Sequence, residues 1–362
     1  MSSTVQFCDK VIERREGESI LEALVRTGSD VPFSCKKGSC HVCMLRALSG
    51  QPTPESQAGL RDSLRQRGYF LPCQMRGPGD FVVERPQRDD LSAVVLVAAK
   101  EFLASDVVRL RLEAGPTFTW LPGQFVNLRR TDGLVRSYSL ASCAEQDYFL
   151  DLHIRRYPDG VMSRWLCDEL QVGAELEVQG PYGICHYRTD EPERSLLLIA
   201  GGTGLGPLTA IAREALARGH RGMIYLYHGA RAAEGLYQDA ELRALAAQHD
   251  NFHYLGCLSH ECHPDHPHGL VPEVAVARHS DLVGWRIFLC GPPAMVQAAR
   301  WQVVLRGAAR QLVHADPFET AAVYLPDDAA TVASIRPDDE LWAALRHGDG
   351  LVEILTDFYN LV

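Results

Sequence analysis

The sequence lacks any run of about 20 consecutive apolar residues, the length that a helix needs to span a bilayer. Its first residues lack the basic flank and apolar run of a secretory signal, so we expect a cytoplasmic protein with no membrane span. Basic residues are in the minority, 36 Lys and Arg against 46 Asp and Glu, which argues against nucleic acid as the main partner. The remaining composition, 46% hydrophobic and 23% charged, is typical of a globular chain, and 362 residues suffice for about two or three domains.

The sequence also lacks the two C-x2-C knuckles that are usual in structural zinc sites, although it contains 11 cysteines. In a reducing compartment this number favours metal ligands over a disulfide framework. Cys35, Cys40 and Cys43 follow a C-x4-C-x2-C spacing, and Cys73 comes after 29 intervening residues. Three thiols in one loop and a distant fourth match the spacing of plant-type 2Fe–2S sites. Gly38 suits a loop that wraps a cluster, because glycine accepts a positive φ.

The segments around these cysteines agree with that interpretation. Residues 5–9 read as a strand, and Ser19 with Glu22 forms a capping box that predicts a helix from Ile20 to Val25. Residues 1–88 resemble a plant-type ferredoxin domain, which implies a β-grasp fold and a cluster held by the four cysteines. The segment holds 13 basic and 10 acidic residues, a net charge of +3, whereas ferredoxins of this type are usually acidic.

Residues 84–90 are polar and without periodicity, so we expect a linker there. Short segments with period-two alternation follow, which predicts an antiparallel barrel over 92–190. Pro-Gly-Gln-Phe at 122–125, Arg-Ser-Tyr-Ser at 136–139 and the Gly-x-x-Ser segment at 160–163 occur in that order. Alone, Arg-Ser-Tyr-Ser is more often a solvated sheet face. The three together resemble the FAD domain of the ferredoxin–NADP reductase superfamily.

That resemblance gives each motif residue a role. Arg136 would pair with the pyrophosphate of FAD, Tyr138 would stack on the isoalloxazine, and Ser139 would bond near its reactive nitrogen. A helix start at 160–163 would hold a phosphate through its amides. His153 departs from the family, which often has an apolar residue at this position. The complete expected FAD set is Arg136, Ser137, Tyr138, Ser139, His153, Ile154, Arg155, Gly160, Val161, Met162 and Ser163.

A glycine-rich turn opens the next segment, 194–318. The apolar run 195–200 is followed by Gly-Gly-Thr-Gly-Leu-Gly-Pro and a helical pattern to Leu216. Alternating strands and helices predict a doubly wound, Rossmann-like domain with its ligand at the strand ends. The later strand 286–290 ends in Cys-Gly-Pro-Pro-Ala-Met, which alone is equally a plain helix start with a buried cysteine.

At this distance from the flavin motifs, however, that run resembles the superfamily's nicotinamide site. Cys290 would pack beside the reacting carbon, and Phe318 would shield the flavin. Arg231 favours a 2′-phosphate and Glu234 the ribose diol of NADH. The expected nicotinamide set is Gly202, Thr203, Gly204, Arg231, Glu234, Cys290, Gly291, Pro292, Met295 and Phe318, and the expected catalytic residues are Cys290, Ser139 and Phe318.

The domain order resembles the reductase components of benzoate dioxygenase, toluene and methane monooxygenase systems. It implies a multidomain α+β and α/β chain that passes electrons from NADH, with NADPH the lesser candidate, to FAD, to 2Fe–2S and to a terminal oxygenase. We expect a monomer. Two alternatives stay open: a reductase for a deoxysugar dehydratase or a flavohaemoglobin-like fusion, and a non-enzymatic redox sensor or cluster-carrying interaction module.

Two segments fall outside these motifs. Residues 253–268 hold five histidines and two cysteines, and a polar loop is favoured over a zinc site there. In the tail, 319–362, the segments 338–347 and 351–362 have helical spacing. That tail resembles the first helices of a truncated globin. It ends before any proximal histidine, so we expect it not to bind haem.

Overall fold

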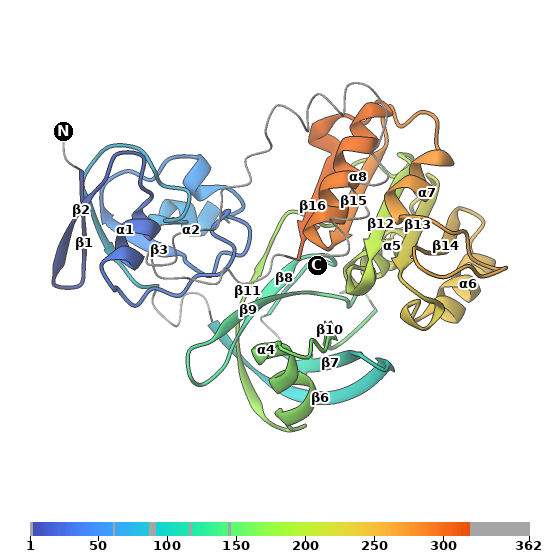
Figure 1. Cartoon of the computed structure of the whole chain (residues 1–362), viewed down its shortest axis with the longest axis horizontal. Helices are drawn as coiled ribbons and strands as arrows, with labels where there is room; N and C mark the ends of the chain where they lie inside the picture. The colour runs from blue at the N-terminus through green and yellow to red at the C-terminus, as the bar shows by residue number, and fades with distance from the viewer. Residues whose placement is uncertain (1–2, 61, 87–91, 116–117, 144–145, 319–362) are drawn as a thin grey trace. The chain divides into compact units, whose positions relative to one another are not determined.

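The computed structural model describes residues 3–60, 62–86, 92–115, 118–143 and 146–318. Within these ranges the strands form three sheets, one for each group of motifs (Figure 1). The expected tail helices at 338–347 and 351–362, and residues 87–90 of the expected linker, lie outside them. No helix in the described part of the chain is both long and apolar enough to cross a bilayer.

The N-terminal sheet is mixed and has the order β2-β1-β5-β3-β4. Strands β1 and β5 are parallel, whereas the other pairs are antiparallel, as in a β-grasp fold. Ser19 and Glu22 form the predicted capping box, which fixes the start of α1 over the sheet. The elements are β1 (Ser3–Phe7), β2 (Lys10–Arg14), α1 (Ile20–Arg26), β3 (Leu45–Ser49), α2 (Asp62–Gln66), β4 (Tyr69–Phe70) and β5 (Phe81–Glu84).

The second sheet is antiparallel with the order β10-β7-β6-β11-β8-β9. A bridge between Leu140 and Leu152 joins its two outer strands and closes the predicted barrel. Alternate apolar side chains fill the interior, among them Val126 and Leu128 of β8. The elements are β6 (Ser92–Ala104), β7 (Val107–Glu113), β8 (Phe125–Arg129), β9 (Val135–Ser139), β10 (Leu150–Arg155), α4 (Val161–Arg164) and β11 (Glu175–Tyr182).

The third sheet is parallel with the order β14-β13-β12-β15-β16, so its topological switch point lies between β12 and β15. Helix α7 packs on α8, and α5 packs on the central strands (Figure 1). The elements are β12 (Leu196–Gly201), α5 (Leu205–Ala217), β13 (Ile224–Ala230), α6 (Asp239–Gln248), β14 (Phe252–Leu258), α7 (Val271–Ala277), β15 (Arg286–Gly291), α8 (Pro293–Leu305) and β16 (Val313–Pro317).

Candidate functional site

The four predicted cluster cysteines lie together in the N-terminal domain. Cys35, Cys43 and Cys73 are each at most 6% exposed, and Cys40 is half-buried. Backbone amides turn toward the sulfurs: the N–H of Lys37 donates to Cys35 Sγ at 3.3 Å and that of Cys40 donates to the same sulfur at 3.4 Å. These bonds favour a thiolate, which is the form that binds metal.

The thiols associate as two pairs, Cys35 with Cys40 and Cys43 with Cys73. The pKa of Cys35 is lowered to about 4, chiefly by a thiol hydrogen bond from Cys40, against the raising effect of burial. Cys43 likewise donates to Cys73, which lowers the pKa of that thiol. In the described residues no three His, Cys, Asp or Glu side chains converge on a single ion. Two separate thiol pairs with amide donors fit the two irons of a 2Fe–2S cluster.

The loop conformation depends on Gly38 and on the segment after Cys73. Gly38 has φ +81°, and a Cβ there would lie 2.8 Å from Gln74 Cγ. Gln74 Nε2 donates to the Lys36 carbonyl at 3.3 Å and to Cys73 Sγ at 3.5 Å. The distant fourth cysteine is therefore held against the loop by its own neighbour in sequence.

Strand β9 carries the Arg-Ser-Tyr-Ser motif next to β8. Arg136 and Tyr138 are half-buried, and Tyr138 packs on the barrel core. Burial raises the pKa of the Tyr138 hydroxyl. On the opposite face, Ser137 Oγ donates to Asn127 Oδ1 at 2.7 Å and Ser139 Oγ donates to Asp316 Oδ2 at 2.5 Å. The motif residues thus point both toward the barrel and toward its neighbours.

Asp316 was not among the residues assigned a role from the sequence, although it stands two residues before Phe318. Desolvation raises the pKa of its carboxyl to about 6, while the Ser139 hydroxyl lowers it. Asp316 lies opposite Cys290 in the β15–β16 register. The sequence signal was a carboxylate at the end of an otherwise uncharged strand.

Cys290 is fully buried at the end of β15, and burial raises the pKa of its thiol. The glycine turn after β12 packs directly on it: a Cβ at Gly204 would lie 2.1 Å from the Cys290 carbonyl oxygen. A Cβ at Gly201 would lie 2.9 Å from Pro292 Cδ. Phe318 is tied to the same place by its N–H, which donates to the Gly291 carbonyl at 2.8 Å. The structure therefore brings the expected nicotinamide residues of β12 and β15 together.

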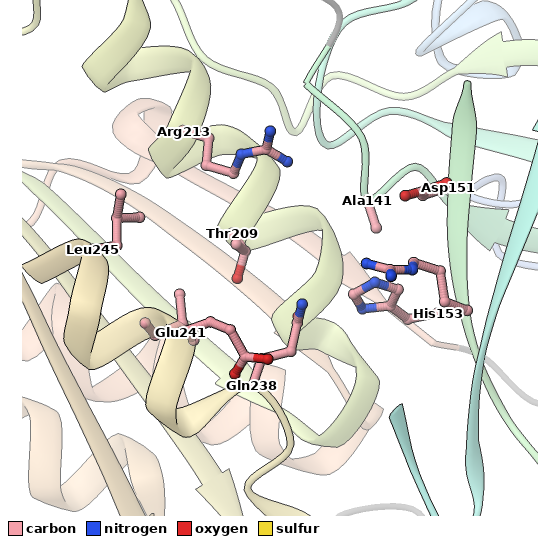
Figure 2. A pocket seen from close by; sticks show the side chains of 10 residues that line it. Ala141, Asp151, His153, Thr209, Arg213, Gln238, Glu241 and Leu245 are labelled. Carbon is pink, nitrogen blue, oxygen red and sulfur yellow. The ribbon is translucent and has the colours of Figure 1, made fainter. Parts of the chain in front are cut away.

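His153 and Arg155 project from β10 toward this glycine turn. His153 Nδ1 lies 3.1 Å from the Tyr237 hydroxyl, and a Cβ at Gly206 would lie 2.7 Å from the same nitrogen. A Cβ at Gly202 would lie 3.6 Å from Arg155 Cζ. His153 and Thr209 of α5 both line a cavity of about 250 Å³. Figure 2 shows these two side chains on opposite sides of it. The assignment of His153, Ile154 and Arg155 to the flavin stays a prediction; Ile154 itself is buried in the barrel core.

The short helix α4 begins at the predicted phosphate segment. Gly160 is its N-cap, and a Cβ there would lie 2.2 Å from Ser163 Oγ and 3.0 Å from Tyr157 Cβ, so a larger residue would have to displace the Ser163 side chain. Met162 and Ser163 are buried, whereas Val161 is exposed. The segment fits a phosphate, and its role also stays a prediction.

Arg231 and Glu234 are exposed in the segment after β13, as a ribose-reading position requires. The histidine-rich loop supplies a third charged group, because Glu261 Oε2 accepts the N–H of Ala233 at 2.7 Å. The histidines of this loop bond locally: His266 Nδ1 lies 3.2 Å from the Gly256 carbonyl and His268 Nδ1 lies 3.2 Å from the Glu261 carbonyl. Among the described residues no three His, Cys, Asp or Glu side chains of this loop converge, and the polar-loop assignment stays a prediction.

Strand β9 contacts the cysteine loop through Ser137 and the end of the parallel sheet through Ser139, an arrangement that fits a flavin and iron–sulfur reductase. Three family models match the chain in this order: the 2Fe-2S iron-sulfur cluster binding domain at 5–76, the oxidoreductase FAD-binding domain at 94–187 and the oxidoreductase NAD-binding domain at 198–301.

Individual relatives agree. The reductase subunit of an aromatic O-demethylase from Amycolatopsis sp. is 35% identical over 89% of this chain and its own full length. A ferredoxin–NAD(P)+ reductase component of naphthalene dioxygenase and salicylate hydroxylase systems from Ralstonia sp. is 31% identical over 89% of this chain and 100% of its own. Among solved structures, the Amycolatopsis cytochrome P450 reductase GcoB has a TM-score of 0.64 and 33% identity, covering 88% of this chain and 99% of its own.

The chain belongs to the family of ferredoxin–NAD(P)+ reductase components of multicomponent oxygenases. It is a flavin and iron–sulfur oxidoreductase that uses FAD, a 2Fe–2S cluster and a nicotinamide cofactor. This confirms the family, fold class and enzyme class expected from the sequence. The alternative of a non-enzymatic module is set aside.

Proposed function

We propose that this chain accepts reducing equivalents from NADH at the strand end formed by Cys290 and Ser139, and delivers single electrons to a terminal oxygenase from the Cys35, Cys40, Cys43 and Cys73 site. One observation carries the proposal: β9 touches both sites. Ser137 Oγ lies 3.5 Å from the Cys40 carbonyl, and Ser139 bonds Asp316 beside Cys290. Arg136 and Tyr138 of this strand would hold FAD, which when bound would convert the two electrons of one hydride into single electrons.

The residues around β9 have complementary tasks. Arg136 provides a planar cation for the pyrophosphate of FAD, and the 160–163 cradle provides amides for its phosphates. Tyr138 offers a ring face, while the buried Cys290 excludes water from the reacting ring. Asp316, with a raised pKa of about 6, can hold a proton near neutral pH and exchange it through the Ser139 hydroxyl.

The test is anaerobic reduction of the holoenzyme by NADH, followed by reoxidation with ferricyanide or with cytochrome c. We expect both acceptors to be reduced, and a Cys43→Ala variant that lacks the cluster spectrum to retain only ferricyanide reduction. Equal loss of both activities in a correctly folded, FAD-loaded variant would contradict the assigned order of electron flow.

We infer a preference for NADH over NADPH from the charges after β13. Glu234 lies in the segment that also contains Arg231, and Glu261 of the histidine-rich loop bonds the Ala233 N–H of that segment, so two carboxylates would repel a 2′-phosphate. Exchanging Glu234 for Ser should therefore raise kcat/KM for NADPH relative to NADH by roughly tenfold, about 1.4 kcal/mol.

Glu261→Gln is the matched variant for this test, because its amide oxygen can still accept the Ala233 N–H. The ratio of kcat/KM values with the two cofactors measures the preference. An unchanged ratio in both variants would contradict the inference.

We further propose that the acceptor is a terminal oxygenase, since the named relatives serve oxygenase or demethylase systems.

All eleven cysteines are unbridged, which supports a reducing, cytoplasmic location. A monomeric state is part of the same proposal, and sedimentation equilibrium of the holoenzyme tests it: a dimer mass would overturn it.

A further inference from the structure

The carbonyl of Cys40, a predicted cluster ligand, is held by side chains of the flavin barrel. Asn127 Nδ2 donates to this oxygen at 3.1 Å, and Ser137 Oγ lies 3.5 Å from it. Asn127 is fully buried and lies opposite Ser137 in the β8–β9 register. The barrel therefore contacts the backbone of the ligand residue itself.

The amide of Asn127 is oriented for this contact. Ser137 Oγ donates to Asn127 Oδ1 at 2.7 Å, which turns the Nδ2 group toward Cys40. The neighbours of Asn127 in β8, Val126 and Leu128, belong to the barrel core, so the asparagine alternates to the outer face of the strand. A buried amide without partners is costly, so the pair holds one arrangement.

A second contact lies one residue further along the loop. His41 has a positive φ of 57° and is 5% exposed. Its ring packs edge-on against Phe125 at 5.7 Å and Tyr182 at 5.0 Å, measured between centroids. Phe125 and Tyr182 belong to the barrel, yet they join the hydrophobic cluster of the ferredoxin domain. This apolar packing holds the loop against the barrel, and the hydrogen bond from Asn127 fixes the position of the loop there.

We propose that Asn127, oriented by Ser137, is a positioning residue that holds the cluster loop against the flavin barrel and thereby sets the rate of electron transfer from flavin to cluster. The inference rests on the proposed function. In the step concerned, one electron leaves the reduced flavin and one ferric iron of the cluster becomes ferrous; no covalent bond of the protein changes. The geometry points to Asn127 because its hydrogen bond is made to a ligand residue and comes from the strand next to the flavin motif.

The test compares the holoenzyme with Asn127→Asp, which keeps the shape of the side chain and places an acceptor against the Cys40 carbonyl. Asn251→Asp is the matched control, because Asn251 Nδ2 also donates to backbone carbonyls, those of His220 and Gly222, but in the parallel-sheet domain. After anaerobic mixing with NADH, flavin reduction and cluster reduction are followed separately by absorbance and by rapid-freeze EPR. Hydrogen exchange of residues 35–44 in the resting holoenzyme is the readout that does not depend on turnover.

We expect flavin reduction to keep its rate in Asn127→Asp, cluster reduction to slow about tenfold or more, and the 35–44 amides to exchange faster while the cluster spectrum is unchanged. Should Asn127→Asp not fold, Asn127→Ser gives the same test in a milder form, since it removes the Nδ2 donor to the Cys40 carbonyl without adding a charge. A wild-type rate of cluster reduction, or an equal slowing in Asn251→Asp, overturns the inference. Failure of the wild-type cluster to become reduced after NADH overturns instead the proposed function.

Discussion

The hydrogen bond between Ser139 and Asp316 joins a residue of the flavin motif to the last strand of the parallel sheet. Asp316 as a whole is half-buried, but its carboxyl is desolvated, and its pKa is raised to about 6. A raised pKa means that the fold favours the protonated acid. Stability is therefore lost as pH rises from about 4, the pKa in the unfolded chain, toward 6.

Replacing Asp316 by Asn should remove that loss. We expect the variant to be about 1–2 kcal/mol more stable than the parent at pH 8, a value discounted for the partial exposure of the residue. The two proteins should converge in stability at pH 4, measured by urea unfolding. The rate of flavin reoxidation should also lose any inflection near pH 6. Equal free energies of unfolding for parent and variant at pH 8 would show that ionisation of Asp316 does not destabilise the fold.

At this scale the sequence predicts groups with a local signature better than groups defined by distant contacts. The capping box of Ser19 and Glu22 is found as expected, because its atoms lie within one helical turn. The partner of Asp316 comes from a strand 177 residues away in the chain, and that of Asn127 from a loop 87 residues away. Only the folded barrel brings them together, so no spacing rule could identify them.

Buried polar side chains contact the glycine turn between β12 and α5 and stabilise it. His228 Nε2 donates to the Gly202 carbonyl at 3.2 Å, and the Tyr237 ring packs edge-on against both His228 and His153. Desolvation lowers the pKa of His228 to about 4, so the imidazole stays neutral in the fold. The turn thus depends on groups that must remain unprotonated.

Acid should destabilise the fold through this histidine. Between pH 6.5 and about 4 the unfolded chain binds a proton at His228 that the fold does not, so stability is full above pH 6.5 and falls below it. In His228→Gln, which keeps a donor for Gly202 but does not titrate, we expect the free energy of unfolding to depend less steeply on pH. The slope should decrease by up to about 1.4 kcal/mol per pH unit. Urea unfolding at pH 7.5 and pH 5.5 measures it; parallel pH profiles for parent and variant would contradict the role of His228.

Across the whole molecule the net charge of −10 is unevenly distributed. Residues 1–88 carry +3, whereas 89–318 carry −6 and 319–362 carry −7. The domain with the cluster is therefore the basic one, and Lys36 and Lys37 lie within its cysteine loop. An acidic face on the partner is the expected complement.

Raising ionic strength from about 0.02 to 0.3 M should slow electron delivery to the protein partner several-fold, since screening shortens the range of attraction to below about 10 Å. Ferricyanide is a small acceptor that needs no docking face, and its reduction serves as the control. A rate of delivery that does not change with salt would contradict electrostatic docking.

The order of the three domains followed from motifs, and the family models and relatives confirm it. The contacts between domains could not be predicted from motifs, because the packing of His41 on Phe125 and Tyr182 involves residues that belong to no motif. Apolar side chains at a domain interface look the same in sequence as those of either core.

The central claim is that electrons pass from the nicotinamide site to the cysteine site along the β9 region. Rapid-freeze EPR of the holoenzyme after anaerobic mixing with NADH tests it most directly. The flavin should be reduced first, and the reduced-cluster signal should then grow at the rate at which the flavin gives up an electron. A cluster that stays oxidised while the flavin is fully reduced, or that is reduced before the flavin, would contradict it.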